Sequence, residues 1–335
     1  MIIESSAPTR IDLAGGTVDI WPLYLFHLNP VTVNIAISLP ARCRLSERTD
    51  HRILLRSQDT GESAEFDDLA GLWSAPKLRM LAKLVYFFAP RGGLEMVTET
   101  TAPPGSGLAG SSALNISICA ALNTLKNAGY DSERLIQIAK NVEAQVIDVP
   151  TGDQDFYPAT YGGVAAIHLT PGGVVREELP VDLERLSRRL ILVYSGQQRN
   201  SGINNWDVMK RHIDGDQGVF QAFEGIVHAA QRIALALRTG NFDEIDGALE
   251  EEWSNRRLLS QGITTPEIES IIARARQLGA GSAKICGAGG GGCLVLSIPE
   301  GRRQEIEQEL RRSGIQVMDY KIVPRGVEIN VVEHP

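Results

Sequence analysis

The sequence has 335 residues, roughly twice an average domain, so two lobes or one large domain are expected. With 43% hydrophobic and 22% charged residues, it is typical of a globular protein with a full core. A net charge of −8 and a pI near 5.4 argue against a general nucleic-acid binder. No run approaches the roughly 20 apolar residues of a membrane span. Because the four cysteines are far apart and no signal peptide is recognisable, the predicted location is cytoplasmic.

The elements predicted in the first half are mainly strands, followed by helices. Alternating and apolar runs predict strands at 9–14, 31–39, 42–47, 52–56, 94–101 and 163–169. Helical periodicity predicts helices at 76–88 and 111–126. A third helix is predicted to end at 146 and to begin at Asp131 or Ser132, since either residue is a suitable N-cap.

The second half is richer in helices, and it has no regular alternation of strand and helix. The pattern predicts a strand at 190–194, then helices at 219–239, 242–261 and 266–278, two strands around a glycine loop within 283–298, and a helix at 302–313 before closing strands. This order favours an α+β fold over a doubly wound sheet. The domains are placed at 1–180 and 181–335.

The segment PPGSGLAGSSA at 103–113 carries the strongest chemical signal. A strand-like run ends at two prolines, glycines follow at G-x-G-x-x-G spacing, and an apolar helix begins at two serines. Glycines let backbone N–H groups approach a phosphate, and the helix N-terminus adds partial positive charge. One of the serines is expected to cap the helix or to offer its hydroxyl to Mg²⁺.

This segment has three other interpretations. A dinucleotide-binding fold needs a second strand that ends in an acidic residue, whereas Asp131 has the right spacing but begins a helix. A phosphate loop of the G-x-x-x-x-G-K type needs lysine where Ser111 stands. A structural glycine turn with an N-cap stays open for this motif alone.

A second glycine-rich segment, SAKICGAGGGGC at 282–293, lies between two apolar strands. Five glycines in six residues cost more chain entropy than a hairpin requires. This favours a backbone surface pressed against phosphates or a catalytic loop, with a flexible turn as the alternative.

Polar residues in two further segments are candidates for metal and substrate contacts. Glu143 lies at the edge of an apolar helical stripe, and Asp153 and Asp155 follow in a turn, where acidic residues are often only solvated. In APTRIDLAGGTVD at 7–19, a strand ends at a Gly-Gly turn that exposes Thr17 and Asp19 to substrate hydroxyls. A strand and turn with a satisfied arginine is the alternative for this segment.

Together these segments resemble the GHMP kinases, the family of galactokinase, homoserine kinase, mevalonate kinase and phosphomevalonate kinase. PPGSGLAGSSA is similar to the phosphate loop P-x-x-x-G-L-x-S-S-A, KICGAGGGGC to the C-terminal glycine motif, and APTRIDLAGGTVD to the first motif. The motifs occur in family order over nearly the whole chain. APTRIDLAGGTVD and TGDQDFYPATYGG look most like heptose 7-phosphate kinases and related sugar kinases.

The resemblance implies a two-lobed α+β architecture, with a ribosomal-S5-like N-terminal domain and a ferredoxin-like C-terminal domain. It implies ATP as phosphoryl donor, with Mg²⁺ held by Ser112 and Glu143, and Asp155 as the group that takes or orients the acceptor's proton beside Arg10. The residues implied to bind ATP are Pro104, Gly105, Ser106, Gly107, Leu108, Ala109, Gly110, Ser111, Ser112, Gly289 and Gly290. Those implied to bind substrate are Thr17, Asp19, Arg199 and Gly287.

Phosphoryl transfer asks mainly for positioning and for neutralising phosphate oxygens, which glycine loops, Mg²⁺ and one carboxylate supply. The sequence therefore predicts an ATP-dependent kinase of a sugar or sugar phosphate, without nucleic-acid or membrane partners, and a homodimer is a further expectation. A kinase of a non-sugar alcohol such as a mevalonate-like acid, and a non-catalytic nucleotide sensor, are the alternatives.

Overall fold

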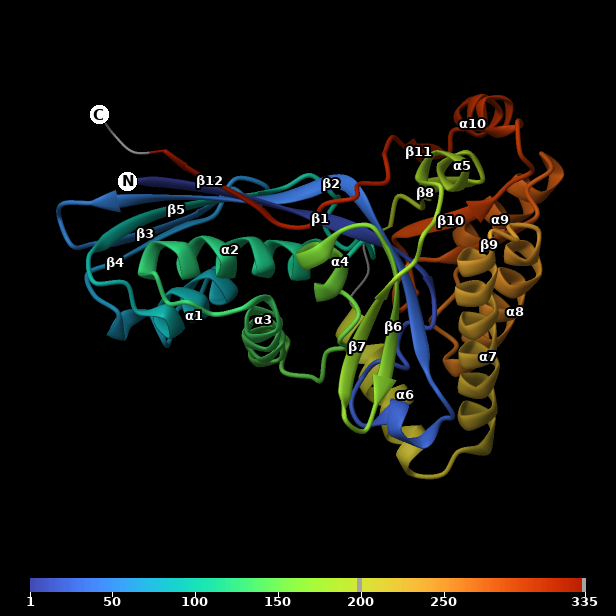
Figure 1. The fold of residues 1–335 in the computed structure, drawn as a ribbon, viewed down its shortest axis with the longest axis horizontal. Helices are drawn as coiled ribbons and strands as arrows, with labels where there is room; N and C mark the ends of the chain where they lie inside the picture. Colours follow the sequence, from blue (N-terminus) through green and yellow to red (C-terminus); the bar gives the residue numbers. More distant parts are fainter. Residues whose placement is uncertain (198–200, 333–335) are drawn as a thin grey trace.

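A large sheet forms one end of the molecule (Figure 1). The computed structural model describes residues 1–197 and 201–332, with backbone alone at 201–204. Strand order is β12-β1-β2-β5-β3-β4, and β6 pairs with β2 and with β7. The strands of this sheet are β1 (Ile2–Ala14), β2 (Val31–Arg48), β3 (Ile53–Ser57), β4 (Ser63–Phe66), β5 (Gly93–Thr100), β6 (Val164–Thr170), β7 (Gly173–Glu178) and β12 (Glu328–Val332).

A smaller antiparallel sheet lies at the other end, and its order is β11-β8-β10-β9. Its strands are β8 (Leu190–Tyr194), β9 (Ser282–Ile285), β10 (Cys293–Ser297) and β11 (Gln316–Met318). The glycine-rich segment connects β9 to β10 as a hairpin.

Helices cover one face of the large sheet and stand beside the small one (Figure 1). Helix α2 is buried along most of its length and packs on β1 and β2, whereas the longer α7 packs against α8. The α-helices are α1 (Arg79–Phe88), α2 (Gly110–Lys126), α3 (Ser132–Ile147), α4 (Phe156–Tyr161), α5 (Leu183–Arg188), α6 (Ser201–Ile213), α7 (Gln217–Thr239), α8 (Glu244–Leu259), α9 (Pro266–Gln277) and α10 (Arg303–Arg312), with 3₁₀ turns η1 (Leu23–Phe26) and η2 (Ala70–Leu72).

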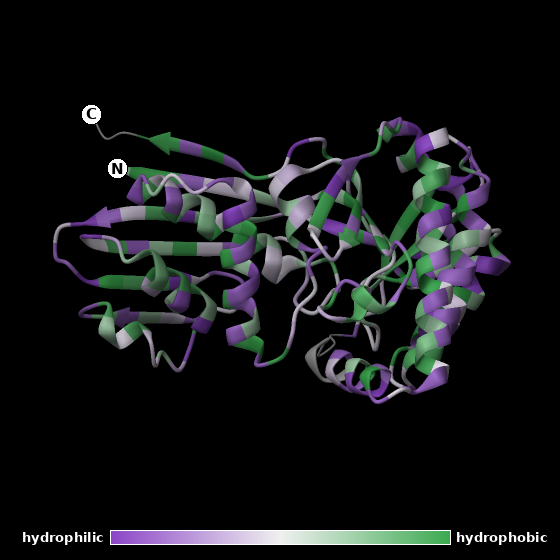
Figure 2. Ribbon diagram, turned by 60° about the horizontal axis from the view of Figure 1, so that its bottom comes forward, coloured by the Kyte–Doolittle hydropathy of each residue, from purple (hydrophilic) through white to green (hydrophobic). Residues whose placement is uncertain are grey.

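Hydrophobic and hydrophilic residues alternate along the strands of the large sheet (Figure 2). Strand β2 shows this at residues 37–45, where buried and more exposed side chains alternate. Because successive side chains of a strand point to opposite faces, one face meets the helices and the other meets solvent. The core between the sheet and α2 therefore fixes the orientation of α2, whose first turn is part of the site described below.

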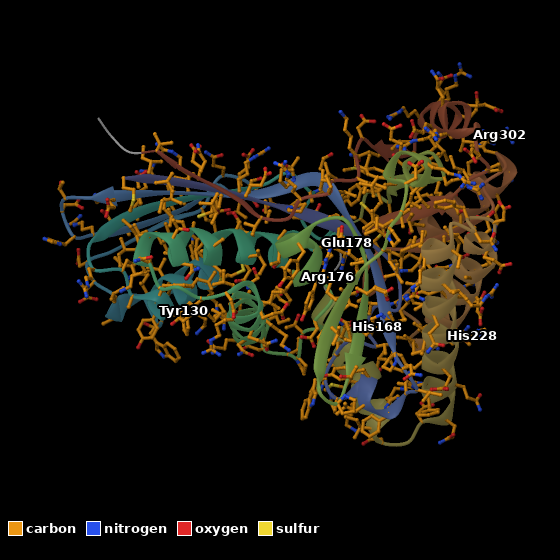
Figure 3. All side chains as sticks on the ribbon, viewed as in Figure 1. Tyr130, His168, Arg176, Glu178, His228 and Arg302 are labelled. Carbon is orange, nitrogen blue, oxygen red and sulfur yellow. The ribbon has the colours of Figure 1, made fainter. Side chains whose placement is uncertain are left out.

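Helix α4 is held in place by the β6–β7 hairpin. Arg176 on β7 lies near α4 (Figure 3); its guanidinium is 5.1 Å from the Tyr161 ring centroid and donates to the Gly162 carbonyl over 3.2 Å. Tyr157 and Tyr161 both donate hydroxyl hydrogen bonds to Glu133 of α3. Since Asp155 directly precedes α4, these contacts fix the position of Asp155.

The α+β class is confirmed, and most predicted elements form near their expected bounds. The chain passes from α2 to α3 without a strand, as the sequence indicated, and Asp131 is the N-cap of α3 because its side chain accepts from the Arg134 backbone N–H. That connection excludes the dinucleotide-binding arrangement.

Several expected bounds were wrong. Strand β1 begins at Ile2 rather than at residue 9, and β2 continues through Pro40 where two strands were expected. Proline is tolerated there because the pairing with β1 shifts register at that point, so no ladder donor is required. The short β4, β7, α4 and α5, and also α6, were not predicted; elements of four to six residues are too short to show periodicity.

The end of the chain returns to the large sheet, where β12 pairs with the outer side of β1. The division into 1–180 and 181–335 stays a prediction. In the described residues, no helix has the length and apolar character needed to span a membrane.

Candidate active site

The first glycine loop lies between β5 and α2, at the start of the helix. Gly105 and Gly107 have φ values of 67° and 77°, a left-handed conformation that glycine adopts without a Cβ clash. Ala109 is also left-handed, with φ 59°, and it is the N-cap of α2. The loop's backbone and the N-terminus of α2 therefore face one cavity, as an anion site requires.

The second glycine loop, between β9 and β10, supports the first. A Cβ on Gly292 would lie 2.6 Å from the Ser106 carbonyl oxygen, and its φ of 91° also requires glycine. The Cys293 N–H donates to that same carbonyl over 2.7 Å. Gly289 and Gly290 instead contact the segment at Ile263, where the Gly290 N–H donates to the Ile263 carbonyl. Their assignment to ATP stays a prediction.

Glu143 of α3 meets the first turn of α2. The hydroxyl groups of Ser111 and Ser112 donate to its two carboxylate oxygens, over 2.7 and 2.9 Å. Burial, with a smaller contribution from the charge of Asp155, raises the pKa of Glu143 to about 7. One carboxylate and a hydroxyl beside a phosphate loop are the oxygen ligands that Mg²⁺ takes alongside nucleotide phosphates. The residues present therefore fit the implied metal.

Asp155 and Arg10 form an ion pair that lines the same cavity. The Arg10 Nε and Nη2 atoms donate to one carboxylate oxygen of Asp155, over 3.0 and 2.7 Å, and its Nη1 donates to the Gly107 carbonyl over 2.5 Å. The Arg10 side chain is almost fully buried, whereas Asp155 keeps 27% of its side chain exposed. Asp155 therefore faces the cavity from a rigid support.

Asp19 and Thr17 lie on the turn after β1. The Asp19 carboxylate is buried and accepts the Gln154 backbone N–H over 2.9 Å. Burial, followed by repulsion from Asp155, raises the pKa of Asp19 to about 7. Thr17 has φ 73°, which is unfavourable for a β-branched residue and costs about 1–3 kcal/mol. Such strain persists only where the surroundings hold the backbone.

Asp153 differs from Asp155, two residues later, in its position relative to the cavity. It is buried and forms an ion pair with Lys140 of α3 over 2.6 Å, and it does not line the cavity. Asp153 is therefore not a solvated turn residue, because the turn folds back onto α3.

One cavity of about 640 Å³ brings most of the predicted residues together. Leu108 and Ser112 lie behind its surface, and Arg199 lies outside the residues that the structure describes. The predicted residues that line it are Arg10, Thr17, Asp19, Pro104, Gly105, Ser106, Gly107, Ala109, Gly110, Ser111, Glu143, Asp155 and Gly287.

Sequence reasoning missed a group of buried charges behind this cavity. Glu252 and Arg256 of α8 pair with each other, Lys284 pairs with Glu252 over 3.5 Å and with Asp12 over 3.4 Å, and all four side chains are fully buried. Glu and Arg four residues apart on a helix usually form an exposed pair, so the sequence carried no signal for this burial. Gln154, which lines the cavity beside Asp155, was also not singled out.

Comparison with known protein families matches two parts of the chain to the two domains of one family. Residues 77–163 match the GHMP kinases N terminal domain and residues 233–316 match the GHMP kinases C terminal domain, together just over half of the chain. The chain therefore belongs to the GHMP kinase family and is a small-molecule kinase.

Its relatives include sugar-phosphate kinases and mevalonate kinases. A D-glycero-alpha-D-manno-heptose 7-phosphate kinase of Campylobacter jejuni is 26% identical, with 97% of this chain and 98% of the relative covered. A mevalonate kinase of Saccharolobus solfataricus is 23% identical over 99% of this chain and 100% of the relative. A solved D-glycero-D-manno-heptose 1-phosphate kinase from Bacteroides thetaiotaomicron superposes with a TM-score of 0.82 at 20% identity, covering 99% of this chain and 100% of that chain.

Proposed function

We propose that this protein is an ATP-dependent kinase that phosphorylates a hydroxyl of a sugar phosphate of the heptose phosphate type. The observation that carries the proposal is the Arg10–Asp155 pair, which lines the same cavity as the phosphate loop and Glu143. The Glu143 carboxylate also accepts the hydroxyl of Ser112. The 26% identity to a heptose 7-phosphate kinase over nearly the full length of both chains supports the substrate class.

In this proposal, the backbone of residues 105–111 and the start of α2 bind the ATP phosphates. Ser112 and Glu143 would hold Mg²⁺, which when bound would neutralise charge on the ATP phosphates. Arg10 orients Asp155 through two hydrogen bonds, and Asp155 accepts the proton of the acceptor hydroxyl. Asp19 and Thr17 bind other hydroxyls of the sugar. Gly287 borders the same part of the cavity.

Two alternatives are less well supported. A non-catalytic sensor would not require a carboxylate supported by arginine beside the phosphate loop. For a mevalonate-like acid, the support is the mevalonate kinase of Saccharolobus solfataricus, which matches over nearly the full length at 23% identity, against 26% for the heptose 7-phosphate kinase. Arg199, as a bidentate partner for a phosphate on the sugar, stays a prediction, as do the cytoplasmic location and the homodimer.

An acceptor panel tests the function. ADP release is measured with Mg²⁺-ATP and, in turn, D-glycero-D-manno-heptose 7-phosphate, free galactose, mevalonate and no acceptor. We expect the sugar phosphate to give the highest kcat/KM. Turnover with mevalonate alone would contradict the substrate class, and ADP release that no acceptor increases would contradict the proposed function.

A further inference from the structure

Arg256 of α8 contacts two segments that line the active-site cavity. Arg256 itself does not line the cavity. Its Nη2 donates to the Gly16 carbonyl over 2.9 Å. Its Nη1 lies 3.2 Å from the Thr17 hydroxyl oxygen and 3.4 Å from the Gly287 carbonyl oxygen. Thr17 and Gly287 both line the cavity, whereas Arg256 is fully buried behind them.

The guanidinium group is fixed from the other side by buried charges. Nε and Nη2 both donate to a single carboxylate oxygen of Glu252, one helical turn earlier on α8. Lys284 pairs with the same carboxylate and with Asp12 of β1. A planar, always charged guanidinium with several donors reaches one oxygen of this carboxylate and the two carbonyls together, which a lysine ammonium cannot do with the same geometry.

Thr17 is the residue that needs such support. Its φ of 73° lies in the left-handed region, which β-branched side chains disfavour. A Cβ on Gly16 would lie 2.4 Å from a carboxylate oxygen of Asp12 and 2.6 Å from the side-chain nitrogen of Gln154, so those side chains would have to move. The hydrogen bonds from Arg256 act on the carbonyl before Thr17 and on the Thr17 hydroxyl.

We propose that Arg256 is a positioning residue for acceptor binding: it holds the Gly16–Thr17 turn in its strained conformation, so that Thr17 and Asp19 meet the acceptor. This inference rests on the proposed function, because it assigns that turn to the acceptor rather than to ATP. In this proposal α8, a helix of the second half of the chain, contributes to the affinity for the acceptor.

Arg256→Lys is the main test, and Arg257→Lys is the matched control. Arg257 is the next residue on α8, is largely exposed and pairs with Glu269 over 3.5 Å. We expect Arg256→Lys to raise KM for the sugar phosphate by about tenfold or more, with KM for ATP and kcat within a few-fold. Arg257→Lys is expected to leave all three unchanged. Equal losses for ATP and acceptor, or no loss, would overturn the proposal.

A second variant separates positioning from general damage to the fold. Thr17→Gly removes the strain, so Arg256→Lys should raise the acceptor KM less in the Thr17→Gly background than in the wild-type background, a non-additive cycle. Additive effects would contradict the proposed action through Thr17.

Hydrogen exchange gives a readout that needs no turnover. Peptides that cover 13–20 should exchange faster in Arg256→Lys than in Arg257→Lys, with peptides of α2 unchanged. Unchanged exchange at 13–20 would overturn the positioning role even if the wild-type enzyme phosphorylates no sugar. Absence of sugar turnover by the wild type would instead contradict the proposed function.

If Arg256→Lys does not fold, Thr17→Val takes its place as the test, because it removes the hydroxyl that Arg256 contacts. Thr17→Val must by itself raise the acceptor KM, and an unchanged KM would overturn the proposal.

Discussion

At the scale of single residues, Glu143 of α3 and Ser112 of α2 form the proposed metal site. If Ser112 and Glu143 hold one Mg²⁺, Ser112→Ala and Glu143→Gln should each raise the Mg²⁺ concentration needed for half-maximal activity. The double variant should show less than the sum of the two effects, as expected for groups that share one ion. The measurement is a titration of initial rate against Mg²⁺ at saturating ATP.

Ser111→Ala is the control for that titration, because Ser111 also donates to Glu143 but is not assigned to the metal. Its Mg²⁺ dependence should be close to that of the wild type. Fully additive losses with an unchanged Mg²⁺ requirement would rule out a shared ion.

Asp19 is expected to make stability depend on pH. Its folded-state pKa, raised to about 7, lies above the ordinary value of 3.8, so the folded protein holds this proton more tightly than the unfolded chain. The resulting stabilisation is present below about pH 4 and is lost as pH rises through about 7. Replacing the carboxylate removes this loss, which amounts to no more than about 4 kcal/mol.

Asp19→Asn should therefore melt several degrees above the wild type at pH 8, with a smaller difference at pH 5.5. Thermal unfolding without ligands, at both pH values, provides the comparison. The variant should also bind the acceptor more weakly, since the carboxylate accepts sugar hydroxyls in the proposed site. A Tm difference that does not change with pH would show that Asp19 does not titrate in this range.

At the scale of elements, the β9–β10 loop supports the phosphate loop through Gly292. Gly292→Ala places a Cβ against the Ser106 carbonyl, at a φ that alanine disfavours. We expect KM for ATP to rise by about tenfold or more, because the loop at 103–107 must shift. Gly301→Ala is the control: Gly301 has φ 84°, but a Cβ there meets nothing within 4 Å.

Both glycine variants should lose stability from the left-handed backbone, but only Gly292→Ala should change KM for ATP. Steady-state kinetics and thermal unfolding of the two variants separate these contributions. If Gly301→Ala changed KM for ATP as much, the effect would come from global destabilisation rather than from the loop contact.

The elements also show what the sequence could and could not predict. Both glycine loops were predictable, because left-handed turns and close backbone approach leave a local trace in the choice of residue. The short α4 was not, since its Phe156–Tyr161 span is held by Arg176 and Glu133 from distant segments. Arg256 was missed for the same reason: its burial depends on β1, β9 and α8 meeting in three dimensions.

At the scale of the whole molecule, residues from both ends of the chain form one site. Thr17 and Asp155 come from the first half, whereas Gly287 of the cavity lining and Arg256 behind it come from the second. The motif order predicted Thr17, Asp155 and Gly287 but not Arg256. It could not predict that β12 would return to pair with β1, because that pairing joins segments more than 300 residues apart.

The central claim is that this cavity transfers phosphate to a sugar-phosphate hydroxyl with Asp155 as proton acceptor. Asp155→Asn keeps the size of the side chain but accepts a proton poorly, so kcat should fall by about 100-fold or more, with ATP affinity within a few-fold. Asp153→Asn is the matched control: it removes the buried pair with Lys140, so it should lower Tm while keeping kcat.

The most direct test follows ³¹P NMR spectra of Mg²⁺-ATP and D-glycero-D-manno-heptose 7-phosphate with the wild type, Asp155→Asn and Asp153→Asn. With the wild type and Asp153→Asn, a second phosphate ester resonance should grow in step with ADP, and with Asp155→Asn it should grow about 100-fold more slowly. No second ester with the wild type, or an undiminished rate with Asp155→Asn, would contradict the account.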